Sequence, residues 1–170
     1  MKYDDLIDQV TLRMMGHDSG SAQRIQHFIK VHRFAQLIGR AECVDAHTQF
    51  VLECAALVHD IGIGPCEAKY GRCTGALQES EGPAYVGELM QGLDIAPEDV
   101  ERICYLVAHH HTYSDIDGID YQILVEADFL VNLYEQQADR GTIERTLQRI
   151  FRTDAGSKLC KTMFGLNKPQ

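Results

Sequence analysis

Apolar residues recur at helical spacing along most of this 170-residue chain, and no alternating strand pattern runs longer than four residues. This pattern predicts an all-α fold, an irregular bundle of about six to eight helices. The length suits a single domain with a substantial core. We expect the core to span about 20–135, with flanking helices at 1–16 and 142–166.

Capping signals place several helix boundaries. Ser21, Asp45 and Asp120 can each cap a helix, and Pro83 and Pro97 suit the first helical position. The predicted helices cover about 3–15, 21–40, 46–60, 83–92, 97–110 and 121–137, with one from Thr142 and a last short one before Gly165. Residues 62–80 hold four glycines, and we predict a long irregular loop there, of a length that is often functional.

Composition narrows the class of partner. A net charge of −9 argues against broad nucleic-acid binding, because neutralising many phosphates needs clustered Lys and Arg. No apolar stretch suits a membrane span or a signal peptide, so we expect a cytoplasmic protein that binds no membrane. The six cysteines form no C-x-x-C pair. Cys43, Cys54 and Cys104 are expected as buried thiols, and a Cys66–Cys73 bridge is left open. A homodimer also stays open.

The chemistry centres on His59-Asp60, which ends an apolar run and precedes Ile61-Gly62. His32 lies on the apolar stripe of its predicted helix, and Asp128 interrupts an apolar segment. Imidazole and carboxylate groups are ligands for divalent metals, and a metal would offset the cost of burying Asp128. The alternatives are that His59 complements the dipole of its helix, that His32 is a core histidine and that Asp128 forms a buried salt bridge.

A triple histidine, His109-His110-His111, ends a later predicted helix. His110 continues the apolar face of Ile103 and Val107, so it is the first choice as a ligand, with His111 second and His109 third. The alternative is an exposed histidine run at a helix C-terminus.

The ordered set of His32, His59-Asp60 and Asp128 resembles the HD-domain superfamily of all-helical, metal-dependent phosphohydrolases. The resemblance covers about 20–135. It implies that these four residues bind metal and that Asp60 bridges two ions. Binuclear members also carry histidine near the end of the fifth helix, which His110, or else His111, matches.

The chain departs from the family pattern at two positions. Glu81 stands where binuclear members have a histidine before Gly-Pro; it could bind a hard metal, favouring Mg, Mn or Fe over zinc, or it could favour a helix start. Glu79 is a less favoured substitute. Ile63 replaces a lysine that typically assists the substrate phosphate, and Lys69 and Arg72 could take over that role or be solvated loop residues.

The resemblance implies hydrolysis of a small phosphate ester, such as a nucleotide or related metabolite, by water activated on one or two divalent ions (Mn, Fe, Mg, Co or Ni). Asp60, His110, Lys69 and Arg72 are the expected catalytic residues. Two alternatives remain: a di-iron oxygenase built on the same ligand set, and a ligand-sensing module that keeps the metal without turnover.

Overall fold

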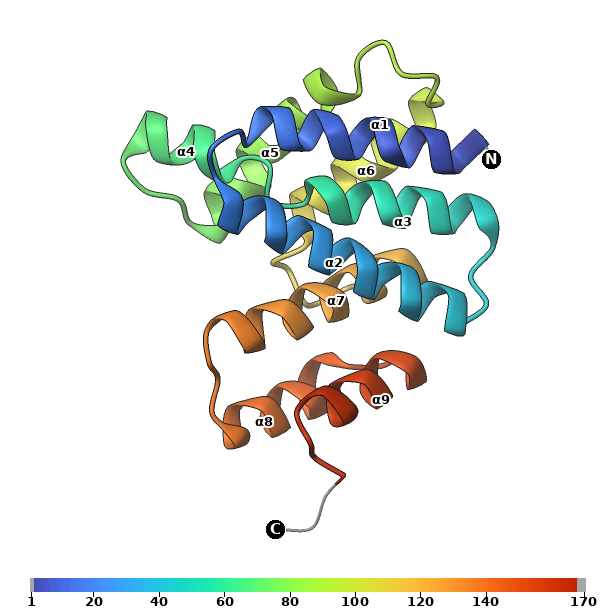
Figure 1. Cartoon of the computed structure of the whole chain (residues 1–170), viewed down its shortest axis with the longest axis vertical. Coiled ribbons are helices and arrows are strands. Elements are labelled where there is room, and N and C mark those ends of the chain that lie inside the picture. The colour runs from blue at the N-terminus through green and yellow to red at the C-terminus, as the bar shows by residue number, and fades with distance from the viewer. Residues whose placement is uncertain (1, 168–170) are drawn as a thin grey trace.

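The computed structural model describes residues 2–167, and in that range it contains nine helices and no strand (Figure 1). The all-α class is therefore confirmed. The helices are α1 (Lys2–His17), α2 (Ala22–Ala41), α3 (Ala46–Val58), α4 (Ile63–Tyr70), α5 (Gly75–Met90), α6 (Pro97–His109), α7 (Ile119–Glu135), α8 (Arg140–Ile150) and α9 (Asp154–Met163).

Helix α3 is the centre of the bundle. It packs against α1, α2, α6 and α7, and every residue from Phe50 to Val58 is buried. Apart from Glu53 this run is apolar, and a helix with apolar residues on all sides has to be enclosed by other elements. The His59-Asp60 pair follows directly, so the most buried helix delivers this pair to the interior of the molecule.

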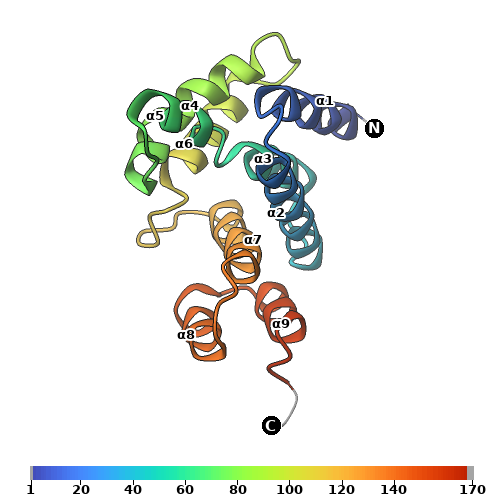
Figure 2. The same cartoon turned by 60° about the vertical axis from the view of Figure 1, so that its left-hand side comes forward.

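Two pairs of helices, α5 with α6 and α2 with α7, lie beside α3. Helices α5 and α6 pack closely together, and α6 contacts α3, while α2 and α7 pack on each other and on α3. Helices α8 and α9 contact α7 and lie at the end of the molecule away from α4 and α5 (Figure 2). None of the helices within 2–167 is long and apolar enough to cross a membrane.

Some of the predicted boundaries are confirmed and others are wrong. Asp45 caps α3 by accepting hydrogen bonds from the backbone N–H groups of residues 47 and 48, each at 3.1 Å, and α6 begins at Pro97. Ser21 precedes α2, but its hydroxyl accepts a hydrogen bond from the Arg24 side chain at 3.2 Å and does not cap a backbone N–H of the helix. Asp120 lies inside the first turn of α7, after Gly118.

The predicted loop over 62–80 is wrong. It forms α4 and the first turns of α5, joined by residues 71–74, and Pro83 lies inside α5. Glycine disfavours an isolated helix, but here it permits close packing. A Cβ at Gly62 would lie 3.3 Å from the Gly82 backbone, and a Cβ at Gly82 would lie 2.8 Å from a Val107 methyl group. Tertiary contact therefore outweighs local propensity in this segment.

All six cysteines lie in the described range and are free thiols. Cys54 is buried as predicted, whereas the prediction is wrong for Cys43, which is exposed, and Cys104 is half-buried. The bridge that was left open between Cys66 and Cys73 is not formed.

Candidate metal centre

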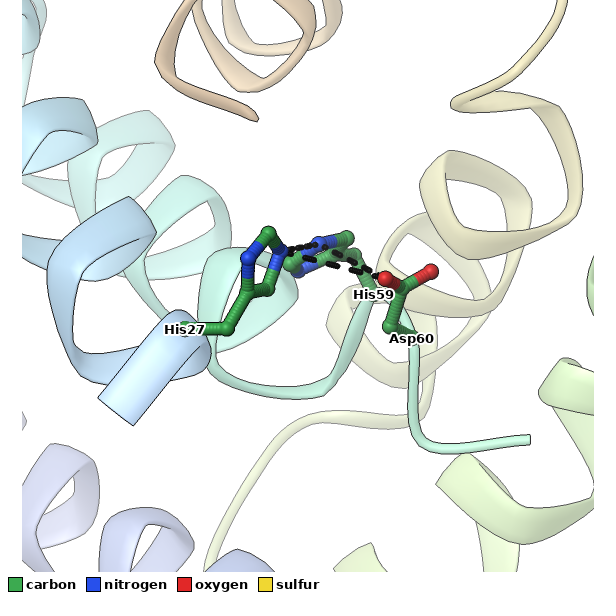
Figure 3. A group of neighbouring side chains, drawn as sticks. All are labelled: His27, His59 and Asp60. Carbon is green, nitrogen blue, oxygen red and sulfur yellow. Dashed lines mark hydrogen bonds and ion pairs between the residues drawn. The ribbon is translucent and has the colours of Figure 1, made fainter. Parts of the chain in front are cut away.

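Three side chains from two neighbouring elements converge at the end of α3 (Figure 3). His27 comes from α2, and His59 and Asp60 follow α3. The Nε2 atoms of the two histidines are 3.2 Å apart, and they lie 3.8 Å and 3.6 Å from Oδ2 of Asp60. Their ligating atoms all lie within 4.8 Å of one another, which is close enough to share one metal ion.

Asp128 on α7 completes this group. Its Oδ1 lies 3.2 Å from Nε2 of His27 and 3.4 Å from Nε2 of His59. This oxygen is buried and accepts no hydrogen bond from any residue that the structure describes. An unsatisfied buried carboxylate oxygen is costly, and a cation at this point would satisfy it.

The second ring nitrogen of each histidine shows which nitrogen is free to bind metal. Nδ1 of His59 lies 3.0 Å from the backbone oxygen of Ala56, which can only accept, so Nδ1 carries the proton. Nδ1 of His27 faces a carboxylate oxygen of Glu135 at 3.0 Å. In the neutral form of both rings, the two Nε2 atoms would present lone pairs to each other, an arrangement that fits a shared divalent metal.

A second group shares Asp60 with the first. Nε2 of His110 lies 3.1 Å from Oδ1 of Asp60, and Nε2 of His111 lies 3.9 Å from the same oxygen. Nδ1 of His110 is bonded to the backbone oxygen of Val107 at 2.8 Å, which again frees Nε2. Asp60 therefore points one oxygen at each group, as a bridging carboxylate would.

The carboxylates of this centre favour a positive charge among them. Burial opposes protonation of His27, but the carboxylates of Asp128, Asp60 and Glu135 outweigh it and raise the pKa of His27 to about 9. Burial also opposes ionisation of Asp128, yet His27 and His59 hold the pKa of that carboxyl far below its usual range. A metal ion would meet the same demand by displacing the proton.

Both the sequence and the fold resemble those of known proteins. The sequence model described as "HD domain" matches residues 24–154. The chain belongs to the HD-domain family. The fold is also similar to the crystal structure of a predicted HD superfamily hydrolase from an uncultured Thermotogales bacterium, with a TM-score of 0.67 and 21% identity over 94% of this chain and 86% of the other. No curated protein matches the sequence.

His27 takes the place in the centre that was expected of His32, and the expectation that His32 would join the centre is wrong. Nε2 of His32 instead lies 2.9 Å from a carboxylate oxygen of buried Glu53. The buried face of α2 consists of His27, Phe28, Val31, Ala35, Ile38 and Gly39. The helical spacing of His27 to Val31, Ala35 and Ile38 was the signal that would have identified it.

The structure brings the other expected histidine and aspartate ligands together: His59, Asp60, Asp128, His110 and His111. His111 also faces the side-chain oxygen of Gln78. His109, the third choice of the triplet, turns away and stacks on Tyr105. Metal binding by these residues remains a prediction.

Glu81 does not reach the centre. It lies within α5, so it does not start a helix, and it accepts hydrogen bonds from Tyr70 Oη at 2.7 Å and Lys69 Nζ at 3.2 Å. The expectations that Glu81 binds metal in the centre or favours the start of a helix are therefore both wrong. Lys69 is paired with Glu81, and Arg72 is exposed between α4 and α5. Glu79 lies nearer the centre, since it accepts a hydrogen bond from the His111 backbone N–H at 3.2 Å.

A pocket of about 360 Å³ opens beside the HD-domain centre. Its wall includes His27 and Asp60, and its other lining residues are Ser21, Gln23, Arg24, Ile63, Glu67, Asn132 and Glu135. Arg24 is the cationic side chain of this wall; it pairs with Asp18 at 3.0 Å and Glu67 at 3.3 Å. Lys69 and Arg72 are not among the lining residues.

Proposed function

We propose that this HD-domain protein is a metal-dependent phosphohydrolase that cleaves a small phosphate ester. The observation that carries the proposal is the division of Asp60 between two groups of imidazoles, with Oδ2 towards His27 and His59 and Oδ1 towards His110. Divalent metal ions held by such groups supply Lewis acidity and lower the pKa of water towards neutrality.

Each ligand has a defined task in this proposal. His27, His59 and Asp128 would hold one ion, His110 and His111 would hold a second, and Asp60 would contact both. Hydrogen bonds from His59 Nδ1 to the oxygen of residue 56 and from His110 Nδ1 to the oxygen of residue 107 fix both rings. Because the rings are fixed, their Nε2 atoms are already oriented for metal binding in the metal-free protein.

Arg24 is our candidate for binding the substrate phosphate. It shares the wall of the pocket with Asp60, and a guanidinium group binds phosphate oxygens in a two-pronged geometry. It takes the role expected of Lys69 and Arg72, because Lys69 is occupied by Glu81 and neither residue lines the pocket. Its present partners, Asp18 and Glu67, orient the guanidinium group.

The donor set also alters the expected metal. Glu81, whose carboxylate would have favoured Mg, Mn or Fe over zinc, does not join the centre. Without it, four imidazoles and two carboxylates remain, and imidazole suits Fe, Ni and Zn as well as Co. We therefore propose Mn, Fe, Co, Ni or Zn, with Mg as the poorest fit.

The test is to count the metal and then screen for activity. Elemental analysis gives the resident metal, and protein loaded separately with Mn, Fe, Co, Ni, Zn or Mg is assayed for phosphate release from mononucleotides, sugar phosphates and cyclic phosphodiesters. We expect metal-dependent release from one class. The oxygenase alternative predicts iron-dependent O₂ consumption instead, and tight nucleotide binding without turnover would favour the sensing module; either result would overturn the proposal.

A further inference from the structure

We infer that Glu135 is a positioning residue for the metal centre, whose carboxylate holds the ring of His27 so that Nε2 faces the ion. The inference rests on the metal centre of the proposed function. The direct observation is the 3.0 Å contact between His27 Nδ1 and Glu135 Oε2. An acceptor at Nδ1 selects the tautomer with a proton there and leaves the Nε2 lone pair free.

His27 differs from the other two well-buried rings in this respect. Nδ1 of His59 and of His110 are bonded to backbone oxygens of their own helices, three residues earlier. His27 alone of the three relies on a side chain from another helix, α7. A carboxylate is a stronger acceptor than a carbonyl, and unlike a carbonyl it can be removed by mutation.

Helix α7 places a carboxylate beside each nitrogen of the His27 ring. Asp128 Oδ1 lies 3.2 Å from Nε2, and Glu135 Oε2 lies 3.0 Å from Nδ1. The two acids are seven residues apart and so share one face of α7. The imidazole is thus held between two carboxylates, one facing the metal centre and one behind the ring.

Glu135 is itself held in place. Its second oxygen, Oε1, accepts from Lys30 Nζ at 2.5 Å, and Lys30 lies one turn after His27 on α2. His27 and Lys30, both on α2, therefore each bind one oxygen of Glu135. Because the carboxylate is clamped, it can define the orientation of His27 rather than follow it.

Removing this acceptor leaves His27 free to rotate or to change tautomer. Loss of such an outer hydrogen bond typically weakens metal binding by about 10–100-fold. We expect this loss for Glu135→Ala. We expect a smaller loss for Glu135→Gln, because the amide oxygen can still accept from Nδ1 but the amide NH₂ would then face Lys30.

The experiment uses Co²⁺ as the probe on the full chain. Its dissociation constant is measured by competition with a chelating indicator, and the visible spectrum of the complex reports the ligand geometry. His27→Ala, which removes the ligand, is the positive control. Glu144→Ala is the matched control, since Glu144 pairs with Arg140 of its own helix, α8, and its loss should leave binding unchanged.

The outcomes separate the inference from the proposed function. Co²⁺ binding by Glu135→Ala at wild-type affinity with an unchanged spectrum would overturn the role of Glu135 and leave the metal centre intact. Wild-type protein that binds no Co²⁺ would overturn both. Should a thermal melt show that the alanine variant is unfolded, the near-isosteric glutamine variant decides: wild-type affinity and spectrum contradict the inference, and weaker binding supports it.

Discussion

Asp60 is the residue on which both halves of the proposed centre depend, because its two oxygens face different groups of histidines. Asp60→Asn keeps the size of the side chain but replaces one ligating oxygen with an amide nitrogen. We predict loss of bound metal and a fall in phosphate release well beyond 100-fold, since outer hydrogen bonds alone cost about 10–100-fold. Elemental analysis beside the activity assay measures both, with Asp8→Asn on the exposed face of α1 as control. Full metal content in Asp60→Asn would contradict the bridging role.

His27 and His32 lie on the same helix, yet we expect opposite effects from replacing them. His27→Ala should lose metal, because its Nε2 belongs to the cluster. His32→Ala should keep metal but lower the free energy of unfolding by about 1–3 kcal/mol, because buried Glu53 loses a hydrogen bond from an imidazole. Urea unfolding and metal analysis of both variants test this. Metal loss in His32→Ala alone would restore the original expectation for His32.

At the scale of elements, the close contact of α5 with its neighbours depends on a glycine. A Cβ at Gly82 would lie 2.8 Å from a methyl group of Val107, which is fully buried on α6. We predict that Gly82→Ala lowers the free energy of unfolding by about 1–3 kcal/mol, as overpacking does, and that this outweighs the better helix propensity of alanine.

The same helix offers a matched control for that prediction. Gly87 is exposed on α5, and a Cβ there would meet nothing within 4 Å. Gly87→Ala should therefore raise the free energy of unfolding by about 0.5–1 kcal/mol. Urea denaturation compares the two variants, and equal stabilisation by both would show that α5 and α6 do not need the close approach.

At the scale of the whole molecule, the proposed ligands join four helices: His27 comes from α2, His59 follows α3, His110 follows α6 and Asp128 lies in α7. A metal bound only by the folded state adds stability, about 2.7 kcal/mol at a free concentration 100 times the dissociation constant. We predict that a chelator lowers the melting temperature of wild-type protein and that re-added metal restores it. Asp60→Asn should melt at the same temperature with and without chelator, and the same insensitivity in wild type would argue against a structural contribution from metal.

From the sequence alone, one could predict the all-α class, the Asp45 cap, the start of α6 and that His59-Asp60, Asp128 and His110 lie together. These features depend on local patterns: apolar spacing, a capping side chain, and polar groups placed in apolar segments. A buried carboxylate such as Asp128 needs a partner in any fold, so its identity alone marks it out.

Only the tertiary structure decided which face of α2 points at the centre. This helix packs on α3, α7 and α9, so Ile25 and Ile29 are partly buried as well as the face of His27. Successive residues of a helix lie about 100° apart, and a stripe drawn through either set looks apolar. Likewise, Gly62 and Gly82 allow close contacts between helices because neighbouring atoms fill the space where a Cβ would lie. Such choices depend on which surfaces meet, which is a property of the packed molecule rather than of any one segment.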